Sequence, residues 1–344
     1  MNKLKLKEYR KIVSYTLLFI LILFFSYRDF LITYRMMLLD NDFVYYHYQN
    51  IIIYYETGNS LYADDLPMNS RFLGLILQYL IFKIVPCFEL TNINLSANVN
   101  DNFVCATFSL AFLNFVFKYA IIILFSFYMK HILNRNIYEL IISIILCFIF
   151  INYIEAFTFD RLTVFFTLLI LASLKTRYLS HILILSSLLV SEKIIMIIGP
   201  LIFLKIYLLK QKNYLPIFIS SITTVILYIS MIYILKSYFG FEFSNLYNNA
   251  GFHRLILDLT DKSHLSNSIL PIFFCIIPYL IYLNNKNKYN LEFSGYEFLI
   301  PFLMVLLGTG GGENNLGRYA MHTFILWLPI FSCQLAHFLK LDEK

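Results

Sequence analysis

Apolar runs of about the length of a membrane-spanning helix recur along this chain, and they restrict its possible folds more than any other feature. A hydrocarbon core about 30 Å thick is crossed by roughly 20 helical residues, and runs of about that length recur from Ile12 to Phe338. Of the 344 residues, 59% are apolar and only 14% are charged, a composition typical of membrane proteins. The sequence therefore predicts an all-α polytopic membrane protein in which residues 1–344 form a single transmembrane domain.

The formal net charge of +6 does not indicate a nucleic-acid partner, because Lys and Arg lie in short clusters between the apolar runs. Such clusters set the orientation of membrane helices, since short cytoplasmic loops carry an excess of basic residues. About ten crossings that start from a cytoplasmic N-terminus place these clusters inside and return the C-terminus to the cytoplasm. The predicted spans cover residues 12–28, 104–129, 137–154, 157–174, 178–191, 194–209, 215–236, 268–284, 297–308 and 319–338.

The first apolar run follows a basic start and is similar to the core of a signal peptide. Tyr27, Arg28 and Asp29 stand where a cleavage site would need small residues, so we interpret the run as a retained anchor.

The cysteines show no metal-type CxxC pair. We expect those within apolar runs to be small core residues that form no disulfide framework: Cys105, Cys147, Cys275 and Cys333.

Two placements fix this topology. The apolar stretch 71–88 is expected to be an interfacial helix with Lys83 reaching the headgroups, because a span here would invert every later loop. The run 178–209 is too long for one crossing and is expected to be a hairpin of two short helices that turns at Glu192 and Lys193. Three outer segments are then long or polar: residues 29–103, 237–267 and 309–318.

Asp40 and Asp42 follow the outer end of the first span and precede Tyr45 and Tyr46. A carboxylate at this place is a candidate general base for an acceptor hydroxyl, and tyrosines line sugar or lipid chains well. The alternative is a solvated loop with an interfacial tyrosine belt.

Charged residues at the next turns have both a functional and a structural interpretation. Asp160 and Arg161 could hold an acceptor or a cation, or only pair with each other or with water. Lys118 lies near the middle of a predicted span, where a lone ammonium is costly, so we expect it to pair with a carboxylate inside the bundle or to face a wet cavity.

The last outer loop, LGTGGGENNLGRYAMH, is rich in glycine. It lacks the GK[ST] ending of a nucleotide P-loop. Arg318 begins the final span. Its planar guanidinium group suits a phosphate, although ordinary snorkelling to the headgroups would also place it there.

His322, one turn further on, is expected to be a packed polar residue. His253 and Arg254 are candidates for a second phosphate contact, with solvated loop charge as the alternative. The His and acid spacing predicts no metal site.

The order of these motifs resembles the GT-C superfamily of polytopic glycosyltransferases, and within it the polyprenyl-phosphate-mannose-dependent mannosyltransferases. The text DFVYY at 42–46, the text GNSLY at 58–62 and the 71–88 helix follow one another as in that family. The segment 191–212 is similar to the family's Lys-containing outer turn with its apolar helix, and GRY at 317–319 to its closing segment.

The resemblance implies an inverting enzyme that moves a sugar, such as mannose, from a polyprenyl-phosphate donor to a lipid or glycan acceptor on the outer face. We expect Asp42 or Asp40 to act as the base and Arg318 to be the first cation at the departing phosphate, together with Lys193, Arg254 and His253. Residues expected at the acceptor or sugar are Tyr45, Tyr46, Asp160, Glu313 and Asn314. No cofactor is required, although the outer carboxylates could hold a divalent cation.

Two other functions fit the same bundle. A transporter or flippase of lipid-linked glycans would need a basic pocket but no catalytic carboxylate, and would favour inverted repeats, which the sequence does not show. An O-antigen-type polymerase would rely on arginines in large outer loops. The Asn-, Ile- and Lys-rich composition suggests an AT-rich bacterial genome and hence a bacterial cytoplasmic membrane.

Overall fold

The computed structural model describes most of the N-terminal two thirds of the chain and its last long helix. The described residues are 3–39, 49, 51–52, 65–66, 71–86, 101–152, 159–208, 210–239, 242–243, 276, 280, 300–301, 303–304 and 321–339.

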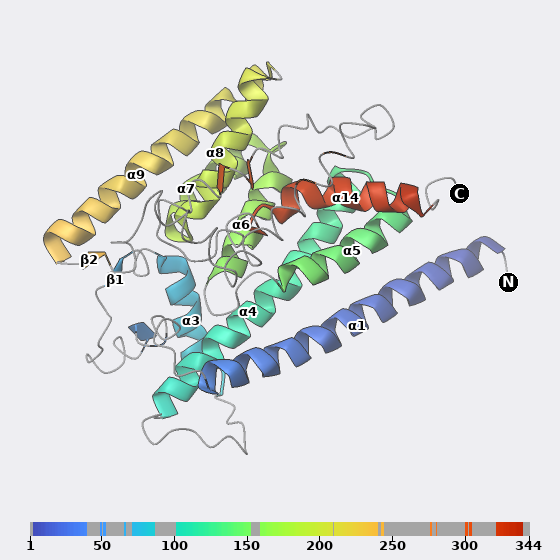
Figure 1. The fold of residues 1–344 in the computed structure, drawn as a ribbon, viewed down its shortest axis with the longest axis horizontal. Coiled ribbons are helices and arrows are strands. Elements are labelled where there is room, and N and C mark those ends of the chain that lie inside the picture. Colours follow the sequence, from blue (N-terminus) through green and yellow to red (C-terminus); the bar gives the residue numbers. More distant parts are fainter. Residues whose placement is uncertain are drawn as a thin grey trace, which may run out of the picture.

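The described residues are mostly helical (Figure 1). The α-helices are α1 (Lys3–Leu39), α3 (Phe72–Ile84), α4 (Asp101–Phe127), α5 (Ile137–Ile151), α6 (Asp160–Ser173), α7 (Arg177–Ser186), α8 (Glu192–Tyr207), α9 (Leu215–Phe239) and α14 (Phe324–Phe338). A π-helical turn, Tyr128–Ile132, continues α4. A short 3₁₀ turn, Ser187–Leu189, follows α7, and another, Lys212–Tyr214, precedes α9.

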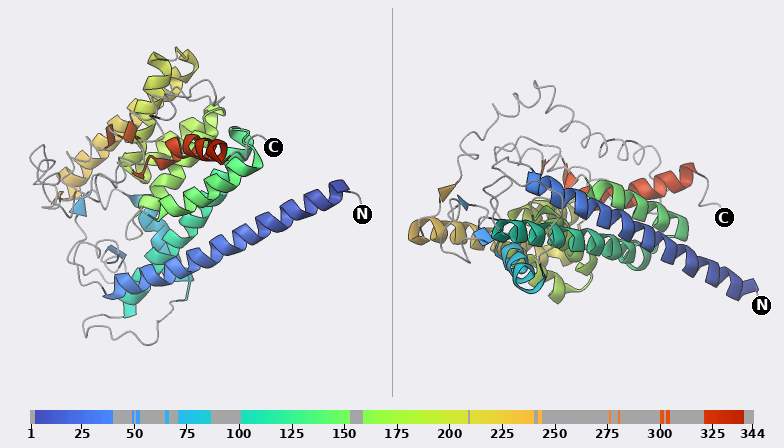
Figure 2. Two further views of the ribbon diagram at one scale, coloured as in Figure 1. Left: turned by 45° about the vertical axis from the view of Figure 1, so that its right-hand side comes forward. Right: turned by 90° about the horizontal axis from the view of Figure 1, so that it is seen from below.

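Helix α4 is the centre of the arrangement, because α1, α3, α5 and α6 all pack against it. Helix α14 lies along α5, as Figures 1 and 2 both show. A second group consists of α7, α8 and α9, in which α9 packs on both α7 and α8, and it joins the first group through α6. The first turn of α1 and the last turn of α14 lie toward the same end of the molecule (Figure 2).

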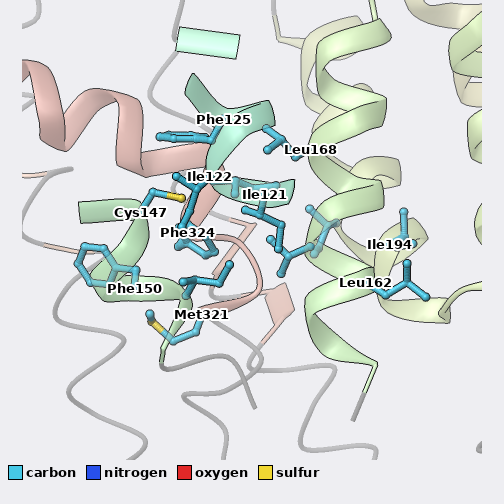
Figure 3. Close-up of a cluster of buried hydrophobic side chains, with 14 of the residues drawn as sticks. Ile121, Ile122, Phe125, Cys147, Phe150, Leu162, Leu168, Ile194, Met321 and Phe324 are labelled. Carbon is cyan, nitrogen blue, oxygen red and sulfur yellow. The ribbon is translucent and has the colours of Figure 1, made fainter. Parts of the chain in front are cut away.

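The apolar core lies where α4, α5, α6, α8 and α14 meet (Figure 3). Ile121, Phe125 and Phe324 are fully buried there. Trp327 on α14 meets Phe150 on α5 edge to face, with ring centroids 5.0 Å apart, a favoured aromatic geometry. The core thus ties the last helix of the chain to helices from its first half.

Among the described residues, two helices are long and apolar enough to cross a membrane: Asn102–Ile132 and Lys212–Tyr238, each with a mean hydropathy of 2.1. Shorter apolar helices are Phe72–Ile84, Ile137–Ile151, Tyr178–Leu189 and Phe324–Phe338. The predicted helical fold with membrane-length helices is confirmed for the described residues, which are mostly helical, while ten crossings stay a prediction. The predicted spans 268–284 and 297–308 lie almost wholly outside the described residues.

The first helix is longer than the predicted span 12–28. It continues through Asp29 to Leu39, because neither Gly nor Pro interrupts residues 3–39. The helix ends one position before Asp40 in the sequence, and Asp40 itself lies outside the described residues.

The run 178–209 does fold as two helices. Helix α7 ends at Ser186, a 3₁₀ turn follows, and α8 begins at Glu192. The turn comes before Glu192 instead of at Glu192 and Lys193, because Ser191 caps α8 with its hydroxyl.

The cysteine prediction is partly wrong. Cys147 and Cys333 are buried and free, as predicted, but Cys105 is disulfide-bonded. Burial in an apolar run indicates a core cysteine, whereas pairing depends on which segment the fold brings beside it.

Two short parallel strands, β1 (Asp65–Leu66) and β2 (Glu242–Phe243), join distant parts of the chain. Asp65 pairs with Glu242 and Leu66 with Phe243. The two strands come from the predicted outer segments 29–103 and 237–267, so these segments meet on one side of the helices.

Candidate functional site

The N-terminus of α6 carries two adjacent charged residues that are both buried. Helix α6 begins at Asp160, and the exposed fractions of Asp160 and Arg161 are 0% and 3%. A carboxylate in the first turn is stabilised by the partial positive charge of that helix end. Because water does not reach these side chains, each needs charged or polar partners within the protein.

The N-terminus of α8 repeats this acid–base pattern with Glu192 and Lys193. The backbone N–H of Lys193 donates to the capping hydroxyl of Ser191 at 3.3 Å. The Lys193 side chain is buried, and its Nζ donates to Asp160 Oδ1 at 3.1 Å. The same oxygen lies 3.3 Å from Nε2 of His322, which is fully buried just before α14. Segments before α14 and at the starts of α6 and α8 thus meet at one carboxylate.

Arg71, directly before α3, also belongs to this group, because it contacts Glu192. Its Nη2 donates to Glu192 Oε1 at 3.2 Å, and both side chains are largely buried. Burial by itself would raise the pKa of Glu192, but the charges of Arg71 and Lys193 outweigh it and hold the pKa below its ordinary value. Glu192 is therefore ionised at neutral pH.

A second group of charges lies between α1, α4 and α6. Lys118 is fully buried, and its Nζ donates to Asp29 Oδ2 at 2.8 Å and to Asn152 Oδ1 at 2.6 Å. The same ammonium lies 4.8 Å from the centroid of the Phe148 ring. Arg161 Nη2 lies 3.5 Å from Asp29 Oδ2. The prediction that Lys118 pairs with a carboxylate inside the bundle is confirmed.

The two groups are joined through the neighbouring residues Asp160 and Arg161, and together we call them the polar network. It contains four cations and three carboxylates in contact with one another, besides one histidine. Charges buried to this extent in an apolar helical protein are expensive and usually functional. Its members are Asp29, Arg71, Lys118, Asp160, Arg161, Glu192, Lys193 and His322.

Most of the polar network comes from segments predicted to lie on the outer side of the membrane. Asp29 and Arg71 belong to the predicted first outer segment, and the pairs at 160–161 and 192–193 belong to predicted outer turns. Ion pairs join these segments directly: Asp29 with Arg161, Arg71 with Glu192 and Lys193 with Asp160. Lys118 belongs to the predicted span 104–129.

Two of the predicted site residues are described, and both belong to the polar network. Asp160, predicted at the acceptor, and Lys193, predicted at the donor phosphate, contact each other. Their predicted roles stay predictions, as do the roles predicted for Asp40, Asp42 and Arg318. The other predicted site residues lie outside the described residues: Asp40, Asp42, Tyr45, Tyr46, His253, Arg254, Glu313, Asn314 and Arg318.

The sequence did not indicate that Asp29, Arg71 and Glu192 are partners in this site. Each stands at the edge of an apolar run, where a charged residue ordinarily faces water. Arg71 shows the difference between sequence and structure most clearly. It directly precedes an apolar helix, where water would be expected, yet it is only 3% exposed.

An apolar groove lies along α3. It has a volume of about 390 Å³ and is lined by α3 side chains, beginning with Phe72, the neighbour of Arg71, and continuing with Leu75, Ile76, Tyr79 and Leu80.

Among the described residues, no group of three or more His, Cys, Asp or Glu side chains is placed to bind a metal ion. Comparisons with models of protein families, with curated proteins and with solved structures found no match to this chain.

Proposed function

We propose that this chain is a multi-pass membrane glycosyltransferase of the GT-C type, which moves a sugar from a polyprenyl-phosphate donor to a lipid or glycan acceptor. The observation that carries the proposal is the polar network. Among the described residues its cations outnumber its carboxylates, and it joins three segments that the basic-loop pattern assigns to one side: residues 29–103 and the turns at 160–161 and 192–193.

A cation-rich site suits this reaction because negative charge builds up on the phosphate as the sugar departs. Buried cations and helix N-termini stabilise such charge strongly where water is excluded. Lys193 and Arg318 are assigned to the departing phosphate, and the carboxylate of Asp42 or Asp40 to the acceptor hydroxyl as general base. The phosphate is a good leaving group, so a strong general acid is unnecessary.

Three features support a lipid substrate at an outer face. The groove along α3 offers apolar surface that begins at Phe72, the residue after Arg71. The pairing of β1 with β2 brings two predicted outer segments together. The disulfide at Cys105, near the start of α4, fits an oxidising compartment outside a bacterial cytoplasm.

Incubation of the purified protein with a radiolabelled polyprenyl-phosphate sugar and membrane extract tests the proposal. We expect label to appear in a new lipid or glycan product and to be absent when the protein is omitted. Recovery of all label in unchanged donor, with each of several sugars and acceptor extracts, would contradict it.

The second candidate is a transporter or flippase of lipid-linked glycans. The Lys118–Asp29 pair favours it, because ion pairs between the helices of a membrane protein also mark ion pathways. A transporter would move labelled lipid between leaflets without breaking the bond between sugar and phosphate, so analysis of the labelled species separates the two functions.

A further inference from the structure

Arg161 is a buried guanidinium whose hydrogen-bonding capacity is poorly used. Its side chain is 4% exposed. Nη1 donates to the carbonyl oxygen of Asn114 at 3.4 Å, and Nη2 lies 3.5 Å from Asp29 Oδ2. Charge-assisted bonds to oxygen are usually about 2.7–2.9 Å long. Within the described part of the chain, Nε has no hydrogen-bond partner.

Among the described residues, the charge in contact with Arg161 is also unbalanced. Asp29 is the carboxylate that contacts both Arg161 and Lys118, and the Lys118 ammonium holds it more closely, at 2.8 Å. The cluster of Lys118, Arg161 and Asp29 therefore carries two positive charges and one negative charge. One further negative charge at Arg161 would leave two balanced pairs in place of a shared carboxylate.

The cluster opens toward an apolar surface. Asp29 is 32% exposed, whereas Lys118 and Arg161 are almost completely buried. Phe25 and Ile32 lie on the same face of α1 as Asp29, one turn away on either side, and are 45% and 48% exposed. An anion that reaches Arg161 past Asp29 would thus have its remaining bulk against apolar side chains.

We propose that Arg161 binds the phosphate of a lipid phosphodiester, with the Lys118–Asp29 pair beside it and the lipid chain along α1. A phosphodiester carries one negative charge, which balances the cluster, whereas a phosphate monoester carries about −1.5 to −2 at pH 7. The planar fork of arginine matches phosphate oxygens. The link to a sugar donor rests on the proposed function, but the phosphate site itself does not.

Binding to the purified full chain in detergent tests this site without any transfer reaction. The probes are geranyl methyl phosphate, an isoprenyl phosphodiester without sugar, and dihexanoyl phosphatidylglycerol, a glycerophospholipid phosphodiester. Affinities are measured by calorimetric titration. Arg161→Gln leaves the Asp29–Lys118 pair balanced, so this variant is expected to fold. Arg28→Gln, the same change at the exposed neighbour of Asp29, is the matched control.

We expect a probe to bind wild type and Arg28→Gln equally and to bind Arg161→Gln about tenfold more weakly or worse, because a hydrogen-bonded charge is lost. Arg161→Lys keeps the positive charge but loses the planar guanidinium group, so this variant should also bind the probe more weakly. If Arg161→Gln does not fold, the result for Arg161→Lys is used in its place. Equal affinities for wild type and both Arg161 variants would overturn the site.

The two probes separate the sources of the phosphodiester. Arg161-dependent binding of the isoprenyl probe alone supports a donor site, while such binding of the glycerophospholipid alone supports the phosphate site and overturns its link to the donor. If Arg161-dependent binding is found but no sugar is transferred, only the proposed function fails.

Discussion

Lys118 Nζ on α4 lies 2.8 Å from Asp29 Oδ2 on α1, although 89 positions separate the two residues. Because α1 packs along α4, this pair lets a carboxylate sit within the long first helix and an ammonium sit fully buried. Each charge makes the burial of the other tolerable.

Removing one charge of this pair should destabilise the protein strongly. Asp29→Asn leaves Lys118 and Arg161 buried together without a carboxylate between them, so we expect a loss of about 3–5 kcal/mol in the free energy of unfolding. The double variant Asp29→Asn/Lys118→Met should recover part of this loss, because it removes one of the two cations. Trp327, the chain's one tryptophan, is fully buried, and its fluorescence can follow unfolding. Additive losses in the double variant would count against the pair.

Gly74 on α3 should not tolerate even a methyl group. A Cβ at this position would lie 2.6 Å from Cγ of Phe159, which is 1% exposed and directly precedes Asp160. Gly74→Ala should therefore overpack the contact and lower the unfolding free energy by about 1–3 kcal/mol. Gly199→Ala on α8 is the matched control, because nothing lies within 4 Å of its Cβ position. This control should be neutral or stabilising, since alanine favours the helix. Equal effects of the two changes would contradict the close packing.

Glu192 should make stability depend on pH. Its folded-state pKa is lowered, so its contribution is present above the unfolded pKa, about 4.3 for Glu, and is lost as the pH falls through the folded value. Glu192→Gln should therefore be less stable than wild type at pH 7, with a difference that shrinks in acid. In an Arg71→Gln background the effect of Glu192→Gln should be smaller, because the main counter-charge is gone. Melting curves at several pH values measure this, and a difference that does not change with pH would speak against it.

Much of the helical content was predictable, because apolar periodicity and turn residues act locally. The helices near 104–129, 137–154 and 215–236 follow from unbroken apolar runs. The end of the first helix was not predictable from charge. Arg28 and Asp29 look like the boundary of a membrane span, but α1 continues past them because Asp29 pairs with Lys118 on α4.

The site was predictable only in part, for the same reason. The cost of a buried lysine indicates that Lys118 needs a carboxylate. Which carboxylate it finds depends on how α1 packs against α4, which no short sequence window contains. The Asp160–Lys193 pair and the disulfide at Cys105 likewise depend on contacts between segments far apart in the chain.

The proposed topology predicts which residues reagents can reach. Single cysteines at Asn59 and Asn314, in predicted outer segments, should react with a membrane-impermeant reagent on intact cells. Cysteines at Asn134 and Asn287, in predicted cytoplasmic loops, should react only after permeabilisation. Native cysteines are blocked beforehand, and a variant without an added cysteine gives the background. Labelling of the Asn134 position from outside would reverse the orientation.

The turnover of two aspartate variants tests the proposed sugar transfer most directly. Asp42→Asn keeps the shape of the side chain but removes the proton acceptor, so the rate of label transfer from a polyprenyl-phosphate sugar should fall about 10²–10⁴-fold while donor binding is retained. Asp40→Asn is the matched control two residues away. Loss of activity in Asp40→Asn alone would move the base to Asp40, whereas near-normal turnover in both variants would contradict the glycosyltransferase mechanism and favour the transporter.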